Sequence, residues 1–181
     1  MDPQANATSA LGFDKVRVEP SVYEALTGQC DLAATVRATP RDGLYLAPSA
    51  IQLAGAEIEM VGLLAREQRL RRILTPIAAE YAFILIDCPP SLGLLTVNAL
   101  TAARRVIVPV QCEYLALEAL TQLLNTIRLI HDNLNPELAI AALVLTMYDA
   151  RTNLSQQVID EVRRHFPRET YQTVIPRNVR L

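Results

Sequence analysis

The sequence predicts an α/β domain built on a doubly wound, mostly parallel sheet, and three observations favour this fold class. Apolar runs alternate along the chain with segments whose apolar residues recur at helical spacing, as in parallel βα units. Two of the runs, 83–86 and 106–110, contain no polar residue, which is typical of strands covered on both faces. No internal repeat or low-complexity linker interrupts the 181 residues, so a single domain over 1–181 is expected.

The expected elements follow one another in order. Residues 43–47 form a short strand closed by Pro48, and 63–79 form a helix with an apolar side and a solvated, arginine-rich side. The strand over 83–86 ends at Asp87 and is stopped by two prolines. The later elements are a helix over 92–103, a strand over 106–110, a long helix with its apolar positions between 120 and 130, a strand over 138–146, a helix over 154–166 and a strand over 171–175.

The composition is that of an ordinary globular protein. About half of the residues are hydrophobic (51%), 20% are charged, and the net charge is −2, which argues against a protein that coats nucleic acid with its whole surface. The first residues lack the parts of a signal peptide, and no apolar run approaches the roughly 20 residues that span a bilayer, so the cytoplasm is expected. Three scattered cysteines and two isolated histidines predict neither a disulfide framework nor a metal site.

Polar residues follow the predicted strands at their carboxyl ends, where open parallel sheets bind ligands. Because such residues also commonly end strands, their position alone does not establish a site. The residues are Asp87, Gln111, Glu113, Thr146, Asp149, Pro176, Arg177 and Asn178. Four apolar residues followed by Asp87 also fit the Walker B pattern, in which the carboxylate holds Mg²⁺ directly or through water. That short pattern occurs in many strands that bind no metal.

Longer strings carry a resemblance that spans the whole chain in the correct order. Residues 87–100 read Asp-Cys-Pro-Pro-Ser-Leu-Gly-Leu-Leu-Thr-Val-Asn-Ala-Leu, and 108–114 read Val-Pro-Val-Gln-Cys-Glu-Tyr. With the further strings 52–57, 146–154 and 174–181, they resemble the ParA/Soj family of chromosome- and plasmid-partitioning P-loop ATPases. The likeness is closer than to the related cell-division or nitrogenase-type proteins. It implies a P-loop NTPase-like sheet and, as the family's cofactors, ATP and Mg²⁺.

The resemblance also implies roles for two carboxylates. Residues 2–8 are similar to the family's second nucleotide motif, so Asp2 is expected to position the attacking water while Asp87 serves Mg²⁺. Phosphoryl transfer needs little from a protein beyond position and charge, which makes such a pair chemically reasonable. The family usually has glycine where this chain has Ala5, and glycine allows backbone angles that alanine restricts.

Near the end of the chain, the resemblance implies contacts with nucleotide and DNA. Pro176, Arg177 and Asn178 are similar to the family segment that lies beside the adenine and ribose. Arg151 and Arg180 fall at positions where the family uses arginines to hold DNA without reading its sequence. Such contacts go to phosphates and depend strongly on salt. Composition alone favours a solvated surface for these arginines.

The sequence contains no phosphate loop of the form Gly-x4-Gly-Lys-Ser/Thr, since its only lysine, Lys15, follows Asp14. In the family this loop lies upstream of the motif that begins here at Asp2, and the family continues beyond Leu181. The resemblance therefore implies a fold that is incomplete at both ends, as from an incomplete gene, a misplaced start codon or a naturally shortened paralogue. The strand over 83–86 would then lack a central neighbour, and we expect a marginally stable or aggregation-prone chain.

Two hypotheses for the function remain open. The family role is ATP-dependent, nonspecific DNA binding by a homodimer on the nucleoid, with hydrolysis stimulated by a ParB-type partner; the chain alone is expected to hydrolyse little ATP. The alternative is a nucleotide-free regulatory module that binds full-length ParA, ParB or DNA, and ATP binding separates the two. A membrane-associated relative of the cell-division type is set aside, because nothing after Ile175 can form the amphipathic helix that such proteins need.

Overall fold

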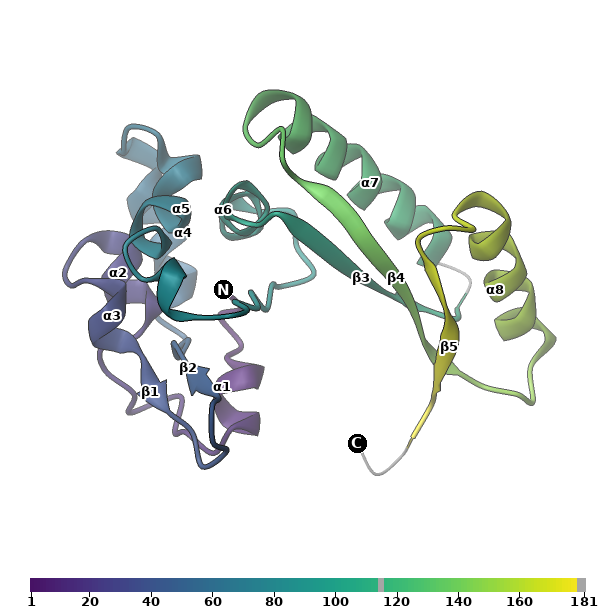
Figure 1. Ribbon diagram of the computed structural model, residues 1–181, viewed down its shortest axis with the longest axis horizontal. Coiled ribbons are helices and arrows are strands. Elements are labelled where there is room, and N and C mark those ends of the chain that lie inside the picture. Colours follow the sequence, from purple (N-terminus) through teal and green to yellow (C-terminus); the bar gives the residue numbers. More distant parts are fainter. Residues whose placement is uncertain (114–115, 179–181) are drawn as a thin grey trace. The chain divides into compact units, whose positions relative to one another are not determined.

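The computed structural model describes residues 1–113 and 116–178, and the chain divides into two compact units, Met1–Ala103 and Arg104–Leu181 (Figure 1). The α/β fold class is confirmed, because the second unit contains a parallel sheet whose strands are joined by helices. The single domain over 1–181 stays a prediction. In the described part of the chain, no helix has the length and apolar character needed to cross a bilayer.

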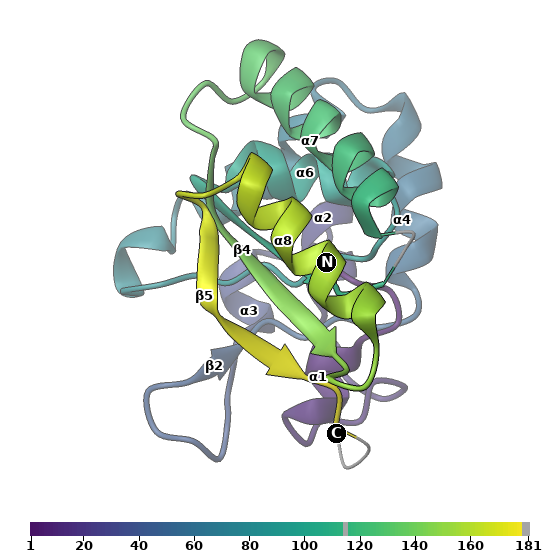
Figure 2. The same cartoon turned by 90° about the vertical axis from the view of Figure 1, so that its right-hand side faces the viewer.

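The unit Arg104–Leu181 is a β-α-β-α-β run whose strands pair in sequence order. Its elements are β3 (Arg105–Gln111), α7 (Ala116–Asn133), β4 (Ala139–Tyr148), α8 (Asn153–His165) and β5 (Thr170–Pro176). The strand β4 lies between β3 and β5, and both pairs are parallel. Crossovers between parallel strands are almost always right-handed, so two steps in one direction put α7 and α8 on the same face of the sheet (Figures 1 and 2). The elements expected in this region are confirmed.

The core of this unit forms between the middle strand and the two helices. On β4, Ala142, Leu143 and Leu145 are fully buried. The helices bury apolar residues at helical spacing, as the sequence pattern predicts. These residues are Leu120, Ile127 and Ile130 on α7, and Val158, Ile159 and Val162 on α8. Burial of the central strand against both helices fixes the strand ends relative to one another.

The unit Met1–Ala103 is mostly helical. Its elements are α1 (Asn6–Ala10), α2 (Val22–Thr27), α3 (Leu32–Thr35), β1 (Arg37–Ala38), β2 (Tyr45–Leu46), α4 (Leu53–Glu59), η1 (Met60–Gly62), η2 (Arg66–Gln68), α5 (Arg69–Leu74), η3 (Ala78–Glu80) and α6 (Leu94–Ala102). The core includes Leu26, Leu53, Met60 and Leu95. The strand expected over 43–47 is reduced to β2, which pairs with β1 in antiparallel fashion.

The single helix expected over 63–79 is wrong. The chain forms η2, α5 and η3 instead, because Ala65 has a φ of 51°, which a right-handed helix does not allow, and Pro76 has no N–H to donate. The expectation that its arginines are solvated is also wrong for Arg69. The guanidinium of Arg69 donates to the Leu26 carbonyl oxygen from Nε (2.8 Å) and Nη2 (2.6 Å), at the end of α2.

The segment 83–86 is extended but pairs with no strand among the described residues, so the expectation of a strand covered on both faces is wrong here. Phe83 and Leu85 are each 88% exposed, and Ile84 is 40% exposed. This exposure leaves an apolar segment and its unpaired backbone groups open to contacts with other molecules.

Because of this exposed segment, Leu85→Lys is expected to raise the protein concentration above which the chain aggregates. A charge on an unpaired apolar segment opposes intermolecular strand pairing, while an exposed substitution changes the free energy of unfolding by less than about 0.5 kcal/mol. Light scattering against concentration measures the effect. Leu129→Lys, at an exposed position of α7, is the matched control and should leave aggregation unchanged. A wild-type monomer that melts cooperatively far above about 50 °C would contradict the premise, since mesophilic domains usually melt between 45 and 65 °C.

Candidate functional site

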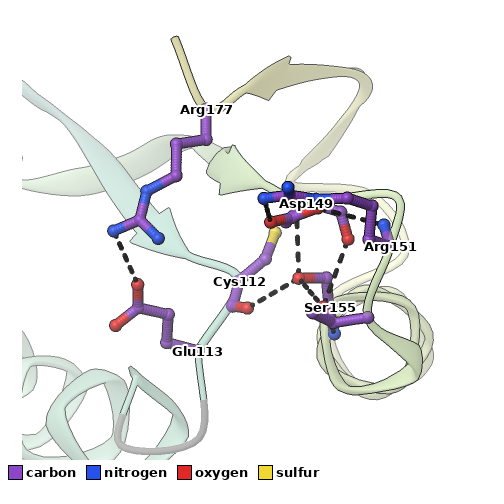
Figure 3. Close-up of polar contacts among 7 residues, drawn as sticks. Cys112, Glu113, Asp149, Arg151, Ser155 and Arg177 are labelled. Carbon is purple, nitrogen blue, oxygen red and sulfur yellow. Dashed lines mark hydrogen bonds and ion pairs between the residues drawn. The ribbon is translucent and has the colours of Figure 1, made fainter. Parts of the chain in front are cut away.

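The carboxyl ends of β3, β4 and β5 meet at one edge of the sheet and carry charged side chains. The parallel register pairs Tyr148 at the end of β4 with Pro176 at the end of β5. Glu113, Asp149 and Arg177 follow the three strands and gather beyond their ends (Figure 3). This edge is where open parallel sheets bind ligands, so the fold positions these side chains for binding.

The loop after β4 holds an arginine against a carboxylate. Arg151 donates from Nε to Asp149 Oδ1 (2.9 Å) and from Nη2 to Oδ2 (2.6 Å), so the guanidinium grips the carboxylate with two parallel bonds (Figure 3). The backbone N–H of Arg151 also donates to Asp149 Oδ1 (3.0 Å). Hydrogen bonds from Arg151, with a smaller electrostatic contribution from Arg177, hold the pKa of Asp149 well below its usual range. The carboxylate is therefore charged at neutral pH.

Ser155, in the first turn of α8, connects two of the strand ends. Its Oγ donates to the Cys112 carbonyl oxygen beyond β3 (3.1 Å) and accepts from the Thr152 hydroxyl (2.9 Å) and the Asp149 backbone N–H (3.4 Å). Thr152 is the N-cap of α8, and its Oγ1 accepts from the Ser155 N–H (3.4 Å). Capping of this kind fixes where the helix begins. The loop that carries Asp149 is thereby tied to both β3 and α8.

The residues expected beside adenine and ribose lie at this same edge. Pro176 ends β5, the Arg177 N–H donates to the Tyr148 carbonyl oxygen (2.9 Å), and Asn178 comes next. The Arg177 guanidinium lies 3.7 Å from a carboxylate oxygen of Glu113, with both side chains about half exposed. Arg180, expected to contact DNA, lies outside the described residues.

In the unit Met1–Ala103, Asp2 and Asp87 line one cavity of about 130 Å³, together with apolar residues of the segment 84–86. Asp2 is buried, and its carboxylate accepts from the Gln4 N–H (2.9 Å) and from Asn6 Nδ2 (3.3 Å). Its carbonyl oxygen accepts from the Ser49 hydroxyl (2.6 Å). Two carboxylates that are distant in the sequence are thus brought to one cavity, while their catalytic and metal-binding roles stay predictions.

The corner after Asp2 has backbone angles that glycine adopts more readily than alanine. Ala5 has φ 56° and ψ 38°, in the left-handed region, and is almost fully buried. A residue with a Cβ adopts these angles at a cost of about 1 kcal/mol, which glycine avoids. The N–H of Ala5 donates to the Asp2 carbonyl oxygen (3.0 Å), so this strained turn helps to place Asp2.

Two polar residues that the sequence analysis gave no role, Glu57 and Asn98, anchor α6. The Leu95 N–H donates to a carboxylate oxygen of Glu57 (3.1 Å), which places a negative charge at the positive end of α6. A Cβ at Gly93 would overlap that carboxylate, so a larger residue there would require the Glu57 side chain to move away from the Leu95 N–H. Asn98 is fully buried and bonds to the backbone of three other residues. An asparagine within an apolar helix is the signal that could have revealed this anchor.

Comparison with known proteins assigns the chain to a family. A sequence profile described as an AAA domain matches residues 1–140. The sporulation initiation inhibitor protein Soj of Bacillus subtilis is 56% identical over 181 residues, which is all of this chain and 72% of Soj. The chain belongs to the ParA/Soj family. The chromosome partitioning protein ParA of Myxococcus xanthus, another ParA/Soj protein, is 48% identical over all of this chain and 64% of its own length.

A solved structure with the same fold was determined with a bound nucleotide. It is described as cobyrinic acid a,c-diamide synthase from Mycobacterium smegmatis with bound ATP analog and magnesium. The TM-score is 0.88 with 39% identity, over 98% of this chain and 72% of that one. The ParA/Soj fold of this chain is therefore that of proteins crystallised with an ATP analogue and magnesium.

Asp2 and Asp87 are the residues of this ParA/Soj chain that would hold a magnesium ion. Mg²⁺ is commonly held by one or two carboxylates plus phosphates of the substrate, and Asp2 and Asp87 supply two carboxylates at one cavity. Ordinary small-molecule sites measure roughly 300–1,000 Å³, so a cavity of about 130 Å³ has room for an ion and a few waters. In the described ranges, no group of three or more His, Cys, Asp or Glu side chains forms an all-protein metal cage.

Proposed function

We propose that this protein acts in chromosome or plasmid partition as a ParA-type ATPase that binds DNA without sequence preference and in an ATP-dependent manner. The observation that carries this proposal is the 56% identity to Soj over the whole chain. ATP joins two copies into a homodimer, and a ParB-type partner stimulates hydrolysis. The protein then acts on the nucleoid, in the cytoplasm.

The two carboxylates divide the chemistry between them. Asp87 holds Mg²⁺, which supplies positive charge to the phosphoryl oxygens, and Asp2 orients the attacking water. Their shared cavity supports this division, because both residues line it. Pro176, Arg177 and Asn178 bind the adenine and ribose from the edge of the parallel sheet.

The arginines bind the DNA backbone. Arg151 is 86% exposed on the loop after β4, and Arg180 follows a few residues after β5. Contacts between guanidinium groups and phosphates position a protein on DNA but carry no sequence information. Binding through them therefore has no sequence preference and weakens steeply with salt.

A second candidate function is a nucleotide-free regulatory module that binds full-length ParA, ParB or DNA. One observation favours it, namely that the sequence contains no Gly-x4-Gly-Lys-Ser/Thr loop. Backbone amides and a lysine of that loop surround the phosphates, so without them little affinity for ATP is expected.

The reading frame upstream of Met1 and a titration with ATP and Mg²⁺ separate the two candidates. We expect the frame to continue into a strand and a glycine-lysine loop, and the protein translated from it to hydrolyse ATP. Asp87→Asn should then lower kcat by about 10²-fold, because it removes a charge that holds the metal. Asp42→Asn, on the exposed surface of the same unit, is the matched control. A stop codon directly before Met1 and no binding of ATP would overturn the ATPase roles and support the regulatory module.

A further inference from the structure

The arginine that we assign to DNA binding is already engaged by a carboxylate of its own loop. Two donors of the Arg151 fork, Nε and Nη2, are taken by Asp149 at 2.9 and 2.6 Å. This is the same two-point geometry with which a guanidinium grips two oxygens of a phosphate. A phosphate can accept from Nε and Nη2 of Arg151 only if it replaces the Asp149 carboxylate.

The carboxylate is the fixed member of the pair, and the arginine is the movable one. The Asp149 side chain is only 19% exposed, whereas that of Arg151 is 86% exposed. The backbone of Asp149 is held by Ser155 and Thr152, through its N–H (3.4 Å) and its carbonyl oxygen (3.1 Å from the Thr152 N–H). When a phosphate arrives, Arg151 can therefore swing away on its long side chain while Asp149 stays in place.

The pair also removes the charge that attracts DNA. An arginine attracts the backbone through its net positive charge, and a carboxylate in direct contact cancels most of that charge at a distance. Arg177 acts on Asp149 as well, although its own closest carboxylate is that of Glu113 at 3.7 Å. Both arginines at this edge of the sheet are thus paired with acidic residues in the structure.

We propose that Asp149 is a built-in competitor of the DNA phosphate for Arg151, so that DNA binding proceeds by exchange of one anion for the other. The proposal rests on the proposed function, because it takes Arg151 as a DNA contact. The ligand is a phosphodiester backbone, and the competing group is the carboxylate of this chain. Asp149 thereby limits the affinity of the protein for any DNA.

The test is Asp149→Asn in the full chain, with fluorescence anisotropy on two unrelated duplexes over a range of salt. Asparagine keeps the shape and an acceptor for the Arg151 N–H but loses the charge. We expect about fivefold tighter binding to both duplexes, the upper end of what an exposed ion pair contributes. The slope of log affinity against log salt should steepen by up to about 0.9, because the wild type frees a carboxylate that takes up a cation when Arg151 leaves it, whereas the variant frees none. Adding Arg151→Ala to Asp149→Asn should abolish the gain.

The matched control is Asp160→Asn, which makes the same change of net charge on α8, where Asp160 accepts from Gln156 and not from an arginine. A gain as large for Asp160→Asn as for Asp149→Asn would show a general charge effect and overturn the proposal. Weaker or unchanged binding by Asp149→Asn, with wild type bound, would also overturn it, since Asp149 would then position Arg151 or play no part. If neither the wild type nor Asp149→Asn binds DNA, both the proposed DNA binding and the proposed competition for Arg151 are wrong.

Discussion

Replacement of Leu145 by alanine is expected to lower the free energy of unfolding of the protein by about 4 kcal/mol. Leu145 is fully buried on β4, the middle strand of the parallel sheet. Its removal deletes buried methyl groups and leaves a cavity between neighbours that have little freedom to collapse, because β4 is hydrogen-bonded on both sides. Equilibrium unfolding in urea, followed by far-UV circular dichroism, measures the loss.

Leu129→Ala is the matched control for this prediction. Leu129 lies on α7 in the same unit and is 63% exposed, so the same substitution should change the free energy of unfolding by less than about 0.5 kcal/mol. If Leu145→Ala lost less than about 1 kcal/mol, β4 would not be the packed centre of a sheet. Because β4 carries Asp149 at its exit, the variant should also loosen the Asp149–Arg151 loop.

Replacement of Asn98 by alanine is expected to lower the free energy of unfolding by about 3 kcal/mol. The fully buried Asn98 side chain accepts from the Leu70 N–H (3.0 Å) and donates to the carbonyl oxygens of Arg66 (2.9 Å) and Leu94 (3.0 Å). Alanine removes all three bonds. It leaves the Leu70 N–H buried without its acceptor, which costs more than the bonds themselves contribute.

The same substitution at Asn125, an exposed residue of α7, controls for the change of residue type. Alanine favours a helix more than asparagine does, so Asn125→Ala should be neutral or slightly stabilising. Equal effects at the two positions would show that Asn98 does not anchor α6. Hydrogen exchange of the Leu70 amide gives a local readout, because this amide should exchange faster in Asn98→Ala before the whole protein unfolds.

The elements after Ala103 could be predicted because their patterns are long and regular. Strands of apolar residues and helices with apolar residues at helical spacing alternate there. The segments before Ala103 were harder for two physical reasons. A left-handed residue such as Ala65 breaks a helical pattern without leaving a trace in it. The segment 83–86 has the composition of a buried strand, but composition does not reveal whether a neighbouring strand is present to pair with it.

The candidate sites could be predicted only where strand ends or longer motifs point to them. The rule for parallel sheets located Glu113, Asp149 and Arg177, and the motif strings located Asp2 and Asp87. The ion pair between Asp149 and Arg151 could not be predicted from the sequence, because acidic and basic residues two positions apart occur in many loops without pairing. The contact between Glu57 and the start of α6 joins distant segments, and only the folded chain brings them together.

The close approach of Glu57 to Gly93 has a consequence for comparing related sequences. A side chain at position 93 would collide with the flexible end of Glu57, so the carboxylate would have to move away from the Leu95 N–H. A relative with alanine or serine at 93 is therefore expected to begin the following helix with another acceptor. Glycine at 93 together with glutamate at 57 therefore marks relatives whose helix begins with the same carboxylate acceptor.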